Sequence, residues 1–259
     1  MIAWSPVATG QGDTDAPTNV IGWFTDLANR TNSEAIPTQA WLTIWHSALA
    51  LAIVVALALP LAVVLAHHRK AELAASWVIN IGRAVPTVTI VGVLVIVSLR
   101  NGFGLEPWPI VIALVLLGLP PTFTNAYAGV RGAEPSAVDA ANAMGFNHTQ
   151  VMWRVELPLA LPLIMAGVRT AAVQIVATEP LAAFFGSEGL GAYLRAGLAD
   201  RVNGGVQVQA GAILVAGVAI VAELSLLIVS RIVVPKGVRV RARAPSTSRT
   251  RSAPEPART

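Results

Sequence analysis

The chain has no cysteine and few charged residues, and each shortage excludes a class of protein. Without cysteine it can form no disulfide framework, no thiolate metal site and no cysteine nucleophile. Charged residues make up 12% of its 259 residues, about half the share of a typical soluble domain, whereas hydrophobic residues make up 54%. A soluble domain of this length cannot bury so much apolar surface in one core. The composition therefore favours a membrane protein.

Motifs for nucleotide or metal chemistry are also missing. No GxxxxGK[ST] motif occurs, so we do not expect this chain to hydrolyse ATP. The glycine-rich stretch 186–191 follows no predicted strand, and we interpret its glycines as part of a turn. His67 and His68 are adjacent at the end of an apolar run, where an interfacial role is expected rather than metal binding. We therefore predict no catalytic residue, no metal and no cofactor.

Long apolar runs dominate the rest of the chain. A transmembrane helix needs about 20 mostly apolar residues. Five segments approach or meet this length, two of them interrupted by an arginine: 47–66, 77–99 with Arg83, 109–127, 159–178 with Arg169, and 210–230. The predicted fold class is an all-α membrane protein with about five transmembrane helices.

Lysine and arginine set the predicted orientation, because cytoplasmic loops are enriched in them. With the N-terminus outside, twelve of the eighteen basic residues fall inside and four outside, and Arg83 and Arg169 lie within spans. We predict an extracytoplasmic segment 1–40, in which residues 20–30 form either an interfacial helix or a loosely ordered leader. A membrane domain 41–235 follows. The basic tail 236–259 is expected to be disordered and cytoplasmic, and its charge is read as a topology signal rather than as a nucleic-acid site.

One polar stretch interrupts the apolar runs, at residues 129–158. It predicts two short helices, the first capped by Ser136 with Asp139 as its partner and ended by Gly145. Asn147 with Gln150 would begin the second helix.

Apolar side chains within this stretch are costly to leave in water. Met144, Met152 and Trp153 lie among its polar residues. Docking into a groove on a cytosolic partner therefore fits better than a solvated loop. Pro158 and Pro162 would mark re-entry into the membrane.

The same stretch resembles the coupling loop of ABC-importer permeases, which has the form EAA–x3–G–x9–I–x–LP. The spacing is met at every position, with Asp for Glu and Val for Ile, by Asp139, Ala140, Ala141, Gly145, Val155, Leu157 and Pro158. Residues 125–131, 134–135, 167–171, 181–184 and 189–191 are similar to the osmoprotectant branch, which imports glycine betaine, carnitine, choline or proline betaine. The resemblance covers about residues 41–235.

The resemblance implies a type I importer permease fold and a set of partners. These are a cytosolic ATPase, an extracytoplasmic binding protein and a second permease copy or a sister permease, in the bilayer of a bacterial plasma membrane. A quaternary ammonium ligand is usually held by an aromatic cage, and this chain has only two tyrosines. We therefore expect tight capture by the binding protein and a low-affinity path in this chain.

The outer segment departs from the family pattern. Glu179-Pro180 and Ser187-Glu188 stand where small or apolar residues are expected. We predict an outer gate formed by Glu179, Glu188, Gly189 and Gly191, whose carboxylates would favour a cationic ligand.

Two charges within the spans are expected to meet. Arg169 and Glu223 lie at roughly 16 and 12 Å from the inner face, at 1.5 Å per residue. We predict a structural ion pair rather than a translocation role, with Arg83 as a competing partner for Glu223.

The predicted function is that of an importer permease for a compatible solute. A permease for an amino acid such as methionine shares the loop and differs in substrate. An ion-gradient-driven transporter is the other alternative, and Glu179 and Glu223 are its carboxylate candidates.

Overall fold

Every element that the structure describes is helical, as predicted. The computed structural model describes residues 19–28, 35–68, 86–104, 107–200 and 204–235. Its elements are α1 (Val20–Ala28), α2 (Ile36–His67), α4 (Thr87–Arg100), α5 (Trp108–Arg131), α6 (Pro135–Ala143), α7 (His148–Val151), a π-helical turn η1 (Met152–Glu156), α8 (Leu157–Thr178), a 3-10 helix η2 (Glu179–Phe185), α9 (Gly191–Ala199) and α10 (Gly204–Val233).

Four of the described helical stretches are long and apolar enough to cross a membrane. They are α2, α5, the continuous run His148–Phe185 and α10. The predicted second span corresponds to α4, which is apolar but has only 14 residues. The first part of that span, with Arg83, lies outside the described residues. The prediction of about five spans therefore fits approximately.

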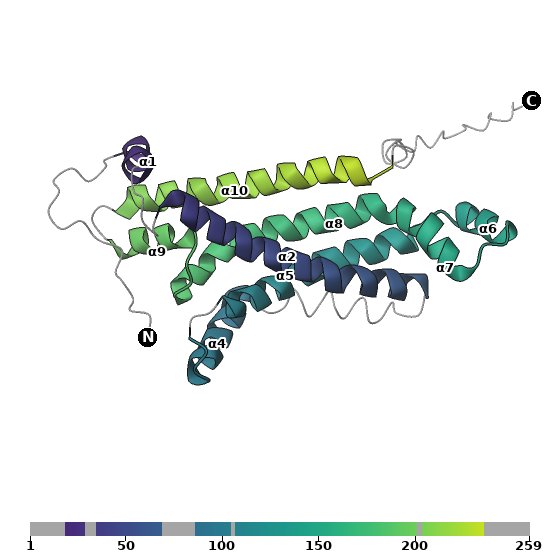
Figure 1. Ribbon diagram of the computed structural model, residues 1–259, viewed down its shortest axis with the longest axis horizontal. Coiled ribbons are helices and arrows are strands. Elements are labelled where there is room, and N and C mark those ends of the chain that lie inside the picture. Colours follow the sequence, from purple (N-terminus) through teal and green to yellow (C-terminus); the bar gives the residue numbers. More distant parts are fainter. Residues whose placement is uncertain (1–18, 29–34, 69–85, 105–106, 201–203, 236–259) are drawn as a thin grey trace, which may run out of the picture.

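Helix α5 lies at the centre of the bundle and packs against α2 and α8. The long helices run side by side along the molecule (Figure 1). Small residues allow the backbones to approach closely, as is common between membrane helices. A Cβ atom on Gly167 of α8 would lie 2.8 Å from the carbonyl oxygen of Pro121 in α5. The α5–α8 contact therefore depends on the absence of a side chain at this position.

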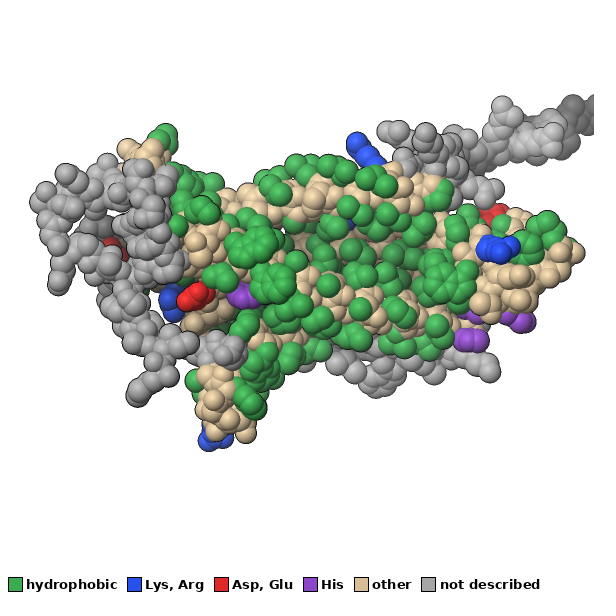
Figure 2. Space-filling view, viewed as in Figure 1, with side chains coloured by type: hydrophobic (Ala, Val, Ile, Leu, Met, Phe, Trp, Pro, Cys, Tyr) green, Lys and Arg blue, Asp and Glu red, His purple; other side chains and the backbone are tan. Residues whose placement is uncertain are grey.

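Helix α10 packs along one side only. It contacts α8, α9 and α1, and its buried residues are Gly204, Ala210 and Gly211 near its start. Large apolar side chains such as Ile220, Leu224 and others along the helix are exposed. On the face in Figure 2, hydrophobic side chains cover most of the middle, and most charged side chains lie toward the two ends. This distribution is typical of a protein that spans a bilayer.

The short helix α1 packs on the bundle through Trp23, which is buried beside Tyr193 of α9 with ring centroids 5.3 Å apart. Ile21, on the same helix, is exposed.

The two ends of the bundle are clearly distinct (Figure 1). Helices α6 and α7 lie at the same end as the C-terminal end of α10. Helices α1 and α9 lie at the opposite end, together with the first turns of α2 and α10. The predicted tail 236–259 lies outside the described residues.

Tight packing between η2 and α9 yields a stability prediction. A Cβ on Gly191 would clash with the backbone carbonyl of Pro180, whereas a Cβ on Gly217 of α10 would meet no atom within 4 Å. Gly191→Ala should lower the melting temperature of the purified protein, because a backbone segment must move to admit the methyl group. Gly217→Ala serves as the matched control and should leave the melting temperature unchanged or raise it slightly, since Ala is the better helix former. Equal melting temperatures for the two variants would contradict this packing.

Candidate functional site: the coupling loop, the outer end and an intramembrane charge pair

The loop at one end of the bundle begins with α6. Its N-cap is Glu134, followed by Pro135 in the first turn, where a missing N–H costs nothing. The predicted cap by Ser136 with Asp139 is wrong: the Ser136 hydroxyl lies 3.3 Å from Glu134 Oε1, and no side chain caps the helix. Proline at this position moves the helix start one residue upstream of Ser136. Asp139 is exposed.

The turn after α6 depends on a glycine. Gly145 has φ +84°, in the left-handed region that β-branched residues resist. A Cβ there would meet no neighbour, so only the backbone conformation demands glycine. Asn147 and Gln150 then form the predicted capping box, with hydrogen bonds of 2.8 and 2.9 Å.

The second helix of the loop does not stand apart from the membrane part. Helix α7 has four residues and continues through the π-helical turn η1 directly into α8. Leu157 and Pro158 lie in the first turn of α8, and Pro162 lies inside this helix. Neither proline interrupts the helical run, and Pro158 is tolerated because it lies in a first helical turn. A displacement of the loop would be transmitted along one continuous helical run.

The outward surface of this loop is apolar in part. Met144 is 69% exposed and Trp153 is 59% exposed. Ala140 is also exposed, whereas Ala141 is buried. We name this surface, formed by Asp139, Ala140, Met144 and Trp153, the loop surface.

A hydrogen bond between distant segments fixes the loop to the bundle. His67 Nδ1, at the end of α2, lies 2.6 Å from Glu156 Oε2 in the π-helical turn, and both side chains are largely buried. The ring of His148 lies 6.2 Å from that of His67. Sequence reasoning missed this contact because the residues are 89 positions apart, and no local pattern connects them.

At the opposite end, η2 and the turn after it are held by α2. His46 Nδ1 lies 3.1 Å from Glu179 Oε1. The backbone N–H of Gly189 donates to Gln39 Oε1 at 2.7 Å, and that of Leu190 donates to Thr43 Oγ1 at 2.9 Å.

Three residues of the predicted outer gate, Glu179, Gly189 and Gly191, therefore lie in the interior. Glu179 is only 1% exposed, and Gly189 is buried with φ +127°. A Cβ on Gly189 would lie 2.9 Å from Glu179 Oε1. Glu179 thus faces the protein and not a ligand arriving from outside, because His46 supplies its hydrogen-bond partner. Glu188 is exposed at the same end, and Gly191 is buried at the start of α9.

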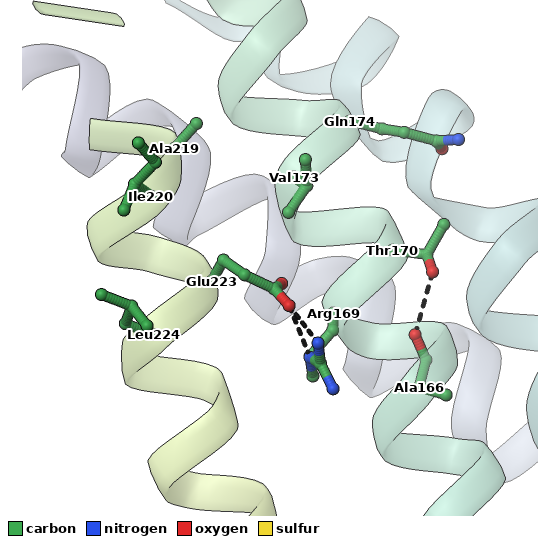
Figure 3. A pocket seen from close by; sticks show the side chains of 9 residues that line it. All are labelled: Ala166, Arg169, Thr170, Val173, Gln174, Ala219, Ile220, Glu223 and Leu224. Atoms are coloured by element: carbon green, nitrogen blue, oxygen red, sulfur yellow. Dashed lines mark hydrogen bonds and ion pairs between the residues drawn. The ribbon is translucent and has the colours of Figure 1, made fainter. Parts of the chain in front are cut away.

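Arg169 of α8 and Glu223 of α10 point toward each other (Figure 3). Arg169 Nε donates to Glu223 Oε1 at 3.0 Å, and Nη2 donates to the same oxygen. Each side chain is 31% exposed. The alternative partner, Arg83, lies outside the described residues.

The buried contact at the outer end yields a second stability prediction. Among the described residues, Glu179 Oε2 has no hydrogen-bond partner, so His46 is the side chain that satisfies this carboxylate. His46→Ala should destabilise the protein by about 1–3 kcal/mol or more, because it leaves a buried acceptor unsatisfied. Adding Glu179→Gln should restore part of the loss. Melting curves of the two variants in detergent test this, and an unchanged midpoint for His46→Ala would contradict it.

Comparisons with known proteins agree with this architecture. The model of a family described as binding-protein-dependent transport system inner membrane component matches residues 48–237. The carnitine transport permease protein OpuCD of Listeria monocytogenes is 34% identical over 206 residues, which are 80% of this chain and 90% of that protein. The choline transport system permease protein OpuBD of Bacillus subtilis is 32% identical over 176 residues, 68% of this chain and 75% of that protein.

A solved structure has the same fold. The inward-facing MetNI methionine ABC transporter aligns with a TM-score of 0.68, over 80% of this chain and all of that chain, at 17% identity. This similarity confirms the predicted fold and says nothing of the substrate. The family match and the identity to the two permeases show that the chain belongs to the binding-protein-dependent transport system inner membrane components.

Proposed function

We propose that this chain is a permease subunit of an ATP-driven importer for compatible solutes such as glycine betaine, carnitine, choline or proline betaine. It forms a path across a bacterial plasma membrane together with a second copy or a sister permease. A cytosolic ATPase supplies the energy, and an extracytoplasmic protein captures the solute.

The substrate class is supported by the named relatives. One similar permease is described as transporting carnitine and another as transporting choline. A third is described as transporting glycine betaine, carnitine and choline. These solutes share a quaternary ammonium group, which has no N–H to donate.

The loop surface carries the proposed coupling to the ATPase. Met144 and Trp153 present apolar area to solvent. Helices α6 and α7 of the same loop lie at one end of the bundle (Figure 1). Apolar side chains exposed in this way fit a groove on a partner protein. ATP-driven closure of the ATPase would displace this surface.

Two connections would carry that displacement to the membrane part. The helical run from His148 to Phe185 is continuous, so α8 moves with the loop. The contact between His67 and Glu156 ties the same turn to the end of α2. The loop therefore acts on two long helices together, which is what opening and closing a path between helices requires.

The proposed orientation of the chain in the membrane rests on the end of the bundle that carries α6 and α7. Helices α6 and α7 and the C-terminal end of α10 lie together in Figure 1, and the described arginines of the adjoining segments are Arg131, Arg154 and Arg231. The positive-inside tendency supports a cytoplasmic position for this end and an extracytoplasmic one for the end with α1 and α9.

Neither alternative function has a comparable observation in its favour. The likeness to a methionine transporter lies at 17% identity and concerns the fold. For an ion-gradient mechanism, Glu179 and Glu223 are the carboxylate candidates, and each is hydrogen-bonded to a basic side chain.

The coupling proposal predicts opposite results for two changes at one position. In the importer assembled with its ATPase and binding protein in liposomes, glycine betaine should stimulate ATP hydrolysis. Gly145→Val should abolish this stimulation, because a β-branched residue resists the left-handed conformation. Gly145→Asn should retain most of it, since Asn adopts that conformation readily. Both variants should still insert and dimerise, because the turn lies outside the spans.

Normal stimulation in Gly145→Val would contradict the coupling role of the loop. Asp139→Ala is expected to act only through contact with the ATPase, since Asp139 caps no helix.

A further inference from the structure

The space between α8 and α10 is a groove of about 640 Å³. Its polar lining consists of Arg169, Thr170 and Gln174 on α8 and Glu223 on α10 (Figure 3). The remaining lining residues are alanine or aliphatic, among them Val173 and Ile220.

The charge pair lies far from both ends of its helices. Arg169 is 12 residues from the start of α8 and 9 from its end, or about 18 and 14 Å at 1.5 Å per residue. Glu223 is 10 residues from the end of α10, or about 15 Å. Both charges are therefore at the depth of the hydrocarbon core, where no headgroup is within reach.

The pair is incompletely satisfied and partly open. Both hydrogen bonds from Arg169 end on Oε1 of Glu223. Among the described residues, Arg169 Nη1 and Glu223 Oε2 have no hydrogen-bond partner. Since each side chain is 31% exposed and lines the groove, the pair is accessible from it.

Lipid is an unsuitable cover for this groove. Ionised side chains inside a membrane face the protein interior or a water-filled cavity, because hydrocarbon cannot solvate them. Arg169, Thr170 and Gln174 form a polar stripe that extends over more than one turn of α8. Contact of this stripe with lipid hydrocarbon would be unfavourable. The groove must therefore face the second permease or the water of the translocation path.

We propose that this groove is a transient binding subsite for a zwitterionic solute that carries a quaternary ammonium group and a carboxylate. The carboxylate would bind the guanidinium of Arg169, which offers paired N–H donors. The quaternary ammonium would lie against the carboxylate of Glu223, with its methyl groups on Val173 and Ile220. This inference rests on the proposed function and adds to it the residues that contact the solute.

The groove is built for weak binding. The solute must replace the existing contact between Arg169 and Glu223. The free energy gained when its two charges bind is therefore largely offset by the loss of this ion pair. None of the nine lining residues is aromatic, so no cage around the ammonium can form. Weak binding suits a path, since the solute must leave on the other side.

The test compares two quaternary ammonium solutes, one with a carboxylate and one without. Uptake of labelled glycine betaine, a zwitterion, and of labelled choline, a cation, is measured in liposomes with the complete importer and its binding protein saturated by each solute. Arg169→Gln should lower glycine betaine uptake about tenfold, the effect of losing one charge-assisted hydrogen bond, and lower choline uptake far less. Glu223→Gln should lower both, because both solutes carry the ammonium. Arg100→Gln removes an exposed arginine at the end of α4 and should change neither.

A double variant guards against misfolding of the single ones. Arg169→Gln with Glu223→Gln leaves no unpaired charge, and its ratio of glycine betaine to choline uptake should fall below that of the wild-type importer. An unchanged ratio, or failure of the double variant to assemble, would make the pair structural and overturn the subsite while leaving the proposed function intact.

The wild-type importer tests the underlying function separately. Uptake of neither solute would contradict the proposed function and the subsite with it. Uptake of choline alone would retain the permease function and overturn the zwitterion subsite.

Discussion

Polar side chains that are shielded from water need partners within the protein, whether packed side chains or hydrocarbon shield them. Three glutamates of the long helical runs follow this constraint, and each is hydrogen-bonded to a basic side chain of a different element. Glu156 pairs with His67, Glu179 with His46, and Glu223 with Arg169. These contacts connect α2 to both ends of the run from α7 to η2, and α8 to α10. The arrangement of the bundle therefore depends on a few polar contacts as well as on apolar packing.

The three pairs differ in burial, and this difference suggests different roles. The pair of His46 and Glu179 is nearly inaccessible and holds the outer turn against α2. The pair of His67 and Glu156 is slightly more open and lies where the coupling loop joins the bundle. The pair of Arg169 and Glu223 is about one third exposed and lines a groove. Accessibility is thus greatest at the pair that lines the groove.

Much of the fold could be predicted from sequence, because apolar runs of membrane length identify helices. The start of α2 at Ile36 was missed, since Gln39, Thr43 and His46 are polar and find buried partners that hydropathy cannot register. At the loop, the glycine turn and the box of Asn147 and Gln150 follow from local rules, whereas the π-helical turn does not. Counting residues from the span ends placed Arg169 and Glu223 at similar depth. The contacts of His67 with Glu156 and of His46 with Glu179 join residues 89 and 133 positions apart, so no local sequence pattern could predict them.

Cross-linking tests the central claim, that the loop surface docks on the ATPase, most directly. The chain has no cysteine, so a single introduced cysteine is the only thiol it contributes. Met144→Cys, in the importer assembled with its ATPase, should form a product with the ATPase when a short thiol-to-amine cross-linker is added. Leu198→Cys, 62% exposed at the opposite end, should form none. No ATPase product from Met144→Cys, or an equal yield from Leu198→Cys, would contradict the assignment of the loop and the orientation of the chain.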